Sequence, residues 1–436
     1  MHYLCISYKH RTMRVLIINT SEKTGGAAVA SNRLMNALNN NGVKARMLVR
    51  DKETDEITVS PVGHPWKAQW AFLWERLCIF LHLHLKRKHL FEIDIANAGV
   101  DVTHSRYFKE ADVIHLEWIN QGMLSLRGIR KILDSGKPVV WTMHDLWPAT
   151  AICHYARGCK RYMASCHDCQ LLPGGGSNRD LSSKVWRKKH KTISGHTIHF
   201  VACSKWLQRQ AAASGLFRHQ TVTAIPNPIN THIFCPASKE EVRKRIGLPV
   251  DKRVILFVSQ KVTDERKGMK YFIEALDKMA ANDPSATATT VVAILGGHGE
   301  EIAGKLNFTA YPLGYISDER AIADVYNSAD VFVLPSLEDN LPNTIMEAMA
   351  CGVPCVGFNV GGIPEMIDHG KTGYVAKERD TDDLAKGIDW AIDASRKSEL
   401  SANAVSKVQR CYSEHAVAMK YIDVYSDALA QRGYNI

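Results

Sequence analysis

The chain has 436 residues, of which 45% are hydrophobic and 23% are charged, a composition typical of a soluble globular protein with two or three domains. No uninterrupted apolar run reaches the roughly 18 residues that a membrane-spanning helix needs. The formal net charge of +10 favours an anionic partner, such as a nucleotide or a phospholipid surface, although a solvated basic surface is the alternative. Nucleic acid is disfavoured, because no nucleic-acid-binding motif accompanies the charge.

The N-terminal segment MHYLCISYKHRT lacks the apolar core of a signal peptide, and Met13 directly precedes a strand-like run. We therefore expect residues 1–12 to be a dispensable extension and the protein to be cytoplasmic.

Residues 13–224 alternate short apolar runs with helix-like segments, a pattern that predicts an open, mostly parallel, doubly wound α/β sheet. The predicted strands are 13–19, 44–50, 111–118, 137–145 and 196–204.

The alternation breaks at AIPNPINTHIFCP (224–236), whose prolines favour an extended linker, and it then restarts. We therefore predict an N-terminal domain at 13–224 and a C-terminal domain at 225–412, with a ligand cleft between the carboxyl ends of their strands. The last helix, within 413–436, is a candidate to pack back on the first domain. The second set of predicted strands is 253–260, 289–297, 329–336 and 355–358.

The stretch PSLEDNLPNTIMEAMACGVP (335–354) would place Asp339 and Asn340 in a loop at the carboxyl end of a strand, before a helix. The unpaired N–H groups of that helix's first turn would suit a phosphate. Glu347, two helical turns past Asn340 on the same face, could accept hydrogen bonds from two adjacent ribose hydroxyls, and Asp339 could bind a second ring. The alternative, a helix cap followed by a solvated glutamate, fits poorly with the apolar neighbours of Glu347.

This block resembles the donor-binding signature of family 4 retaining glycosyltransferases: an acidic residue, seven residues, Glu, and then Ala-Met-Ala-Cys-Gly-x-Pro. The resemblance implies the GT-B fold, with two Rossmann-like domains facing each other across a cleft, and a metal-independent reaction. It also implies that the N-terminal domain, 13–224, binds the acceptor and that the C-terminal domain, 225–412, binds the nucleotide-sugar. It implies that Glu347 binds the ribose of a nucleotide-sugar and that Asp339, where the family has Glu, binds the transferred sugar. Amides near Asn340 and Leu341 would help to hold the diphosphate.

The segment VSQKVTDERKGMKYFIEAL (258–276) resembles the family's strand, loop and helix in which two basic residues grip the diphosphate. Lys267 matches the family's lysine, and either Lys261 or Arg266 would be the second cation. Preorganised cations stabilise the charge that develops as the glycosidic bond breaks.

Two further segments, 312–336 and 361–375, also match the family. By this resemblance Gly314 borders the base, while Gly361 and Gly362 form a turn that approaches the sugar closely.

In the first domain, Gly25 and Gly26 lie between a predicted strand and a helix, where backbone N–H groups meet phosphate or sugar. The pattern is not G-x-G-x-x-G, which argues against a dinucleotide oxidoreductase. His144 ends a predicted strand, at a position where the family carries a histidine near the transferred sugar and the acceptor; a structural role is the alternative.

The segment CHYARGCKRYMASCHDC (153–169) gathers four cysteines with spacing that suits a structural zinc site, although free thiols and disulfides are alternatives. A subset of the family has a similar run. We expect no cofactor in catalysis itself. The candidate zinc ligands are Cys153, Cys159, Cys166 and Cys169.

Residues 64–89 interleave tryptophans with lysines and arginines, a pattern typical of a basic amphipathic helix that lies in a membrane interface. An ordinary helix packed on the sheet is the alternative. We expect peripheral contact with the inner face of a membrane, since related enzymes often act on lipid-linked acceptors.

The best interpretation is a retaining glycosyltransferase that moves a sugar from a nucleotide-diphosphate sugar to a glycan or lipid-linked glycan acceptor, in surface polysaccharide or glycolipid synthesis. Two alternatives stay open. A nucleotide-sugar epimerase of GT-B architecture would change the donor sugar with no acceptor present, and a non-catalytic nucleotide-sugar-binding protein would bind donor without turnover.

Overall fold

The computed structural model describes residues 12–63 and 65–433, which form two compact units. The first unit comprises residues up to 202, residues 208–225 and those from 418 onward, and the second comprises residues 203–207 and 226–417. The unit borders therefore fall at 225/226 and 417/418, and a short segment of the first predicted domain groups with the second unit.

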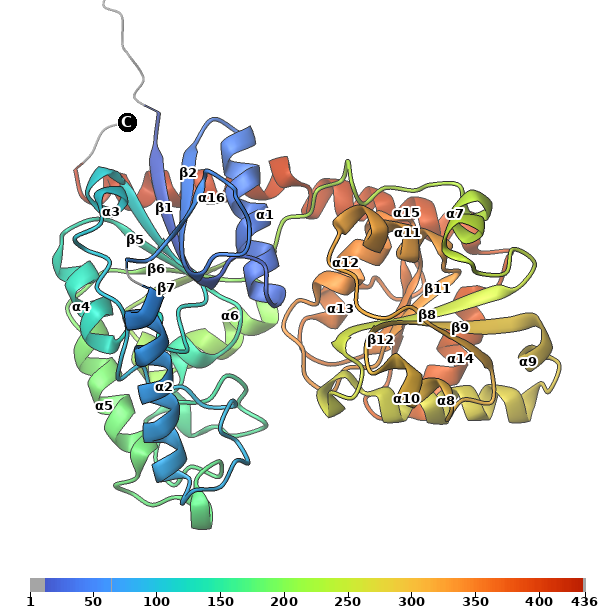
Figure 1. Cartoon of the computed structure of the whole chain (residues 1–436), viewed down its shortest axis with the longest axis horizontal. Helices are drawn as coiled ribbons and strands as arrows, with labels where there is room; N and C mark the ends of the chain where they lie inside the picture. Colours follow the sequence, from blue (N-terminus) through green and yellow to red (C-terminus); the bar gives the residue numbers. More distant parts are fainter. Residues whose placement is uncertain (1–11, 64, 434–436) are drawn as a thin grey trace, which may run out of the picture. The chain divides into compact units, whose positions relative to one another are not determined.

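The first unit is built on a seven-stranded sheet in which every pair of neighbours is parallel (Figure 1). The strand order is β3-β2-β1-β4-β5-β6-β7, and the central strands are almost wholly buried, as branched apolar runs favour. Its strands are β1 (Arg14–Ser21), β2 (Lys44–Asp51), β3 (Val59–Pro61), β4 (Val113–Leu116), β5 (Val139–Met143), β6 (His199–Ala202) and β7 (Thr221–Ala224). Its α-helices are α1 (Gly26–Asn40), α2 (Pro65–His82), α3 (Arg106–Glu110), α4 (Leu126–Asp134), α5 (Leu181–Ile193) and α6 (Lys205–Ala212), the last of which begins in the segment that groups with the second unit.

The second unit has a six-stranded parallel sheet in the order β10-β9-β8-β11-β12-β13, flanked by helices (Figure 1). Its strands are β8 (Arg253–Lys261), β9 (Thr290–Gly297), β10 (Thr309–Pro312), β11 (Val331–Leu334), β12 (Cys355–Phe358) and β13 (Gly373–Ala376). Its helices are α7 (Lys239–Ile246), α8 (Met269–Asn282), α9 (Ala286–Thr289), α10 (Gly299–Ala303), α11 (Glu319–Ser328), α12 (Asn343–Ala350), α13 (Ile363–Met366), α14 (Thr381–Ile392) and α15 (Lys397–Cys411). Two parallel sheets with helices confirm the predicted pair of doubly wound α/β domains.

The last helix, α16 (Glu414–Ala430), lies against the first unit's sheet for most of its length. The Tyr425 hydroxyl lies 2.7 Å from Nδ1 of His115 on β4, and the Tyr421 hydroxyl lies 3.0 Å from Oγ1 of Thr142 on β5. Both tyrosines are buried, so α16 completes the core of the unit that the chain began. The last three residues of the predicted segment 413–436, residues 434–436, lie outside the described part of the chain.

Candidate functional site

The loop between β11 and α12 carries the predicted Asp339, Asn340 and Leu341, and all three residues are buried. The Ser204 hydroxyl donates a hydrogen bond to Oδ1 of Asn340 at 2.6 Å. The helix begins at Asn343, so Pro342 lies just before its first turn. The loop is therefore a fixed part of the second unit.

Gly361 and Gly362 hold this loop by close backbone approach. A Cβ at Gly361 would lie 1.7 Å from the Asp339 carbonyl oxygen, and one at Gly362 would lie 1.8 Å from that of Asn340. The Gly362 N–H also donates to the Asp339 carbonyl oxygen at 3.1 Å. Only glycine leaves room for the loop backbone at these two positions, so Gly361 and Gly362 allow the loop to pack against them. The close approach of these glycines to a sugar stays a prediction.

Two cationic side chains, those of Lys267 and Arg266, lie next to the Asp339 carboxylate. Lys267 Nζ donates to Asp339 Oδ2 at 2.6 Å, the Ser336 hydroxyl donates to the same oxygen at 3.1 Å, and the Arg266 guanidinium lies 3.7 Å from it. Burial alone would raise the pKa of Asp339, but the charges of Lys267 and Arg266 and these hydrogen bonds lower it below its usual value. Asp339 is therefore a carboxylate at neutral pH.

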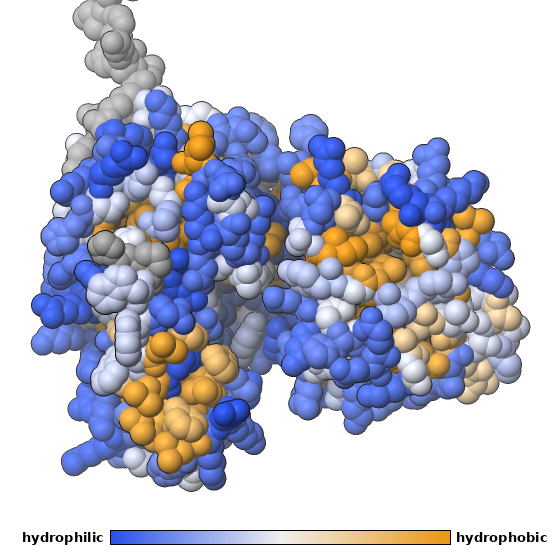
Figure 2. Space-filling view, in the orientation of Figure 1, coloured by the Kyte–Doolittle hydropathy of each residue, from blue (hydrophilic) through white to orange (hydrophobic). Residues whose placement is uncertain are grey.

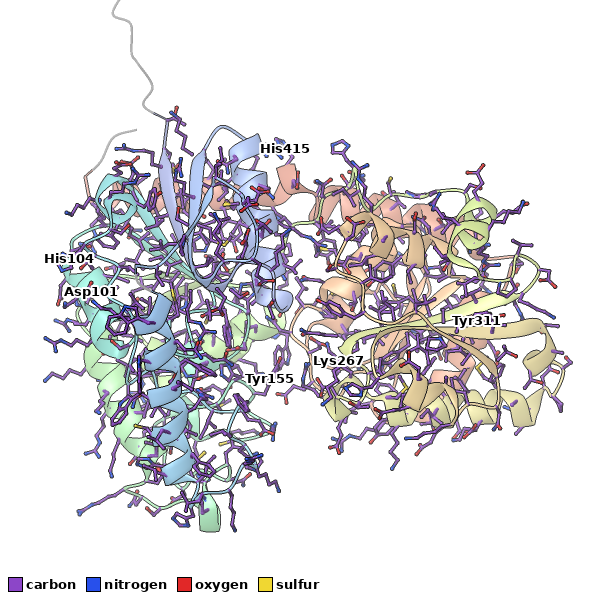
Figure 3. The ribbon with its side chains drawn as sticks, in the orientation of Figure 1. Asp101, His104, Tyr155, Lys267, Tyr311 and His415 are labelled. Atoms are coloured by element: carbon purple, nitrogen blue, oxygen red, sulfur yellow. The ribbon has the colours of Figure 1, made fainter. Side chains whose placement is uncertain are left out.

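A tight turn presents these cations. The Asp264 carboxylate accepts from the Arg266 N–H at 3.0 Å, and the Arg266 guanidinium donates to the Glu338 carbonyl oxygen at 3.0 Å. Gly268, with a φ of +77°, ends the turn against Pro335, and Lys267 reaches out from it at the end of the second unit's strands (Figure 3). The side chains of Lys267 and Arg266 stay partly exposed, so both can reach an anionic ligand.

Glu347 is buried in α12, where the Tyr326 hydroxyl of α11 donates to its Oε2 at 2.9 Å. The solvated alternative for this glutamate is therefore wrong. Sequence reasoning missed Tyr326, whose hydroxyl orients the carboxylate, and Ser336. Both lie in the segment 312–336 that matches the family, but nothing in that segment singles out these two side chains.

Lys261 and Gly314 lie elsewhere in the same unit. Lys261 is exposed at the end of β8, opposite Gly297 of β9, and its side chain has no hydrogen bond or ion pair within residues 12–63 and 65–433. Gly314 follows β10, and its carbonyl oxygen accepts from the Gly296 N–H at 2.7 Å. The structure thus brings Arg266, and not Lys261, into the group around Asp339.

In the first unit, His144 lies just past β5, and its Nε2 lies 2.6 Å from Oε2 of Glu117. The other oxygen of Glu117 lies 3.2 Å from the buried His115. Burial lowers the pKa of His115, with Glu117 opposing the shift and His144 adding to it. Sequence reasoning missed Glu117; its place near the carboxyl end of the predicted strand of 111–118, just past the observed β4, was the available signal.

Next to His144, Asp145 belongs to a buried charged cluster. His154 lies between two carboxylates, with Nδ1 2.7 Å from Asp145 and Nε2 2.6 Å from Asp94. Burial lowers the pKa of His154, but the two carboxylates outweigh it and raise the value to about 10. Trp118 Nε1 also donates to Asp145 at 2.9 Å, so the segment after β5 is locked in place.

Gly25 and Gly26 join β1 to α1, as predicted. Gly25 has a φ of +96°, and no heavy atom lies within 4 Å of the place where a Cβ would sit. The backbone there is open to a ligand, although the neighbouring Thr24 N–H is already taken by Glu53 at 3.0 Å.

Two family models match this chain, one described as Glycosyltransferase Family 4 over residues 24–233 and one as Glycosyl transferases group 1 over residues 252–394. Together they take in both α/β units. The chain belongs to the family 4 glycosyltransferases.

Curated relatives of this family 4 chain include a D-inositol 3-phosphate glycosyltransferase of Thermobispora bispora, 31% identical over 48% of this chain and 51% of the relative. An uncharacterized glycosyltransferase of Methanocaldococcus jannaschii is 24% identical over 78% of this chain and 91% of that relative. The chain thus spans about half the length of the first relative that it matches.

Solved structures share the fold of this family 4 chain. Sucrose-phosphate synthase from Thermosynechococcus elongatus matches with a TM-score of 0.68 and 18% identity, over 96% of this chain and 100% of that one. HepE of Anabaena, solved in complex with UDP-glucose, matches with a TM-score of 0.61 and 15% identity, over 95% and 100% of the two chains. The family 4 chain has the GT-B fold.

The four cysteines proposed as zinc ligands are free thiols, partly buried. Burial, with a smaller contribution from neighbouring thiols, raises the pKa of Cys153 to about 11 and that of Cys166 to about 12. Within the described ranges, however, no three His, Cys, Asp or Glu side chains stand in an arrangement that could hold a metal ion. As arranged here, Cys153, Cys159, Cys166 and Cys169 do not fit zinc, and zinc binding stays a prediction.

Within the described residues, no helix is both long enough and apolar enough to cross a bilayer.

Proposed function

We propose that this protein is a retaining, metal-independent glycosyltransferase that moves a sugar from a nucleotide-diphosphate sugar to an acceptor hydroxyl. The acceptor would be a glycan or a lipid-linked glycan in surface polysaccharide or glycolipid synthesis, with residues 64–89 in contact with the cytoplasmic face of a membrane; residue 64 lies outside the described residues. The observation that carries the proposal is the grouping of Lys267 and Arg266 around Asp339 in the unit that also buries Glu347.

Lys267 and Arg266 would bind the diphosphate. When the bond between the sugar and the diphosphate breaks, its electron pair stays on the leaving oxygen and adds one negative charge to those that the diphosphate already carries. Fixed cations stabilise this added charge most in the transition state. Asp339 holds Lys267 by a hydrogen bond, so the ammonium is oriented before a donor arrives.

Glu347 would bind the ribose, and Asp339 the transferred sugar. Tyr326 donates to one oxygen of the Glu347 carboxylate, which fixes the group for two adjacent hydroxyls. Asp339 is an acceptor at neutral pH, because the neighbouring cations lower its pKa. HepE, which shares the fold, was solved with UDP-glucose, and this supports a nucleotide-sugar donor here.

The leaving phosphate would take the proton of the acceptor hydroxyl as the new bond forms on the same face of the sugar. His144, held by Glu117, would hydrogen-bond the transferred sugar and position it for attack. In this scheme neither His144 nor Glu117 has to remove the proton of the acceptor hydroxyl.

A thermal-shift screen tests the donor site. Wild type and Glu347→Gln are heated with UDP, GDP, ADP, CMP or dTDP and without added metal. A nucleotide at one hundred times its Kd adds about 2.7 kcal/mol to the free energy of unfolding. We expect one nucleoside diphosphate to stabilise the wild type and not the variant; stabilisation by none would contradict the donor site.

Product analysis then separates the alternatives. Transfer requires an acceptor and releases the nucleoside diphosphate, whereas an epimerase changes the donor sugar alone. A binding protein leaves the donor intact under both conditions.

A further inference from the structure

The outer face of α2 exposes a row of large apolar side chains. Trp66 is 60% exposed, Trp70 66% and Trp74 54%, and they follow one another every four residues, on one side of the helix. Figure 2 shows apolar surface gathered over this helix. Leu73, Leu77 and Leu81 are also exposed on this side of α2, and the exposed Leu85 and Phe91 follow after the end of the helix. Contiguous apolar patches of this kind mark contact surfaces.

The opposite face of α2 packs on the rest of the first unit, so the fold of this unit does not bury the outer face. Glu75 accepts from the N–H groups of Ile95 and Ala96 at 2.9 and 2.6 Å, and Arg76 pairs with Asp94. These buried polar contacts fix the rotation of α2 about its own axis. The tryptophans therefore cannot turn inward without breaking the buried ion pair.

The surroundings of this apolar face are cationic. In 65–91 the only carboxylate is Glu75, which is fully buried on the inner face. Lys67 extends over the Trp66 ring at 5.5 Å, and the exposed Lys86, Arg87 and Lys88 follow the helix. Tryptophan with lysine and arginine is the pairing that an anionic bilayer interface favours.

A cavity of about 370 Å³ opens behind the same helix, between α2, α4 and α5. Its wall is largely apolar, and its lining includes His82, Arg127, Lys184 and Lys188 but no carboxylate. In the described part of the chain, the side chains of Arg127, Lys184 and Lys188 have no hydrogen bond or ion pair. Apolar walls with unpaired cations suit a phosphoryl group attached to an acyl chain.

We propose that the outer face of α2 lies in the interface of an anionic bilayer and that the cavity between α2, α4 and α5 binds the phosphoryl head group of an anionic lipid. The inference deepens the proposed function, since it names the surface at which the transferase meets its acceptor. Lipid binding itself does not require transfer, so the two can be tested apart.

Vesicle co-sedimentation tests the proposal. The full chain is mixed with vesicles of phosphatidylcholine alone or of phosphatidylcholine and phosphatidylglycerol in equal parts. We expect strong binding to the mixed vesicles only, with a blue shift of tryptophan emission. Equal binding to both compositions, or to neither, overturns the proposal.

Two variant pairs locate the contact. Trp70→Ser/Trp74→Ser removes the apolar face, with Ile57→Ser as the control, since Ile57 is 84% exposed elsewhere in the same unit. We expect the double variant to bind mixed vesicles at least about tenfold more weakly and the control to bind as the wild type does. If the double variant instead only abolishes self-association in sedimentation velocity, the face contacts a second copy and the proposal is wrong.

Lys184→Glu/Lys188→Glu tests the cavity. Its matched control, Lys305→Glu/Lys386→Glu, makes the same change in net charge on exposed lysines of the second unit. We expect at least about a tenfold loss for the first pair and less than about twofold for the control. Equal losses would mean that net charge alone acts and would overturn the head-group site. A thermal shift with inorganic phosphate, expected to be absent, shows that the lipid rather than free phosphate is bound.

The outcome is distinct from that of the donor site. Stabilisation of both variants by the nucleoside diphosphate that stabilises the wild type shows that they are folded and that the second unit works. Failure of lipid binding with a normal nucleotide response rejects this inference and leaves the proposed transferase standing.

Discussion

The ammonium of Lys267 lies 2.6 Å from the buried carboxylate of Asp339, across 72 residues of chain. The pair joins a turn after β8 to the loop before α12, so one contact both fixes a structure and places a cation. Its two roles can be separated by mutation.

Lys267→Ala should lower the rate of transfer by about 10²- to 10³-fold, because a preorganised cation no longer meets the leaving diphosphate. It should also lower the free energy of unfolding by about 3 kcal/mol, since Asp339 would be left buried with a weaker partner. Steady-state kinetics and chemical denaturation measure the two effects.

The double variant Lys267→Ala/Asp339→Asn provides the control. Without the carboxylate charge, most of the lost stability should return, but neither the activity nor the affinity for the nucleoside diphosphate, which has no sugar for Asp339 to bind, should return. If activity returns with stability, Lys267 acts only as the partner of Asp339, and its proposed contact with the diphosphate is wrong.

A second prediction compares Gly268 with Gly247, which share a φ of +77°. A Cβ at Gly268 would lie 1.8 Å from the Pro335 carbonyl oxygen, whereas nothing lies within 4 Å of one at Gly247. Gly247→Ala should therefore cost only the strain of the left-handed backbone, about 1–2 kcal/mol. Gly268→Ala should cost at least about 3 kcal/mol and weaken nucleotide binding, because the turn must move away from the loop. Equal costs in urea denaturation would contradict this geometry.

The sequence predicted the central strands of both sheets but missed β3, β7, β10 and β13. These four strands lie at the edges of the two sheets, where they have few buried residues. An edge strand is paired on one side only and needs no long apolar run, so its pattern does not stand out from a loop.

The candidate site shows the same limit. Asp339 and Glu347 were found because they belong to one short motif, and Lys267 because it belongs to another. Glu117 and Tyr326 were not, because each acts on a partner 27 or 21 residues away. Glu117 lies near the end of a predicted strand, but a single sequence does not show which side chain it contacts there. The sequence also left open whether Lys261 or Arg266 lies near Asp339. The structure answers this, because the backbone turn at 265–267 places Arg266 next to Asp339.

The third prediction concerns pH. In the folded protein the pKa of His154 is raised to about 10, against an ordinary value of 6.5. A raised pKa adds stability that is complete below about pH 6.5 and is lost as the pH rises towards 10. The buried Lys189 has its pKa lowered by burial and therefore acts in the opposite direction over part of this range. The pH dependence of the wild type's stability alone would therefore not separate the contribution of His154 from that of Lys189.

The comparison with His154→Gln isolates the effect. The stability advantage of the wild type over this variant should be largest near pH 6 and should shrink by a few kcal/mol on going to pH 10. Thermal melts across this range measure it, with a variant of the exposed His298 as the control. An advantage that stays constant with pH would show that His154 is neutral in the folded state.

The fourth prediction tests Glu117 as a positioning residue for His144. Glu117→Gln keeps the size of the side chain but removes the charge that lies 2.6 Å from His144 Nε2. The imidazole would then lose its fixed orientation near the transferred sugar, so kcat should fall about 10- to 100-fold while KM for the donor changes little.

Thr142→Val is the matched control, since Thr142 touches His115, 2.8 Å away, in the same buried network. If Thr142→Val lowers kcat as much as Glu117→Gln does, the effect comes from the network's packing and not from His144. A kcat that stays at the wild-type value in Glu117→Gln would leave Glu117 without the assigned role.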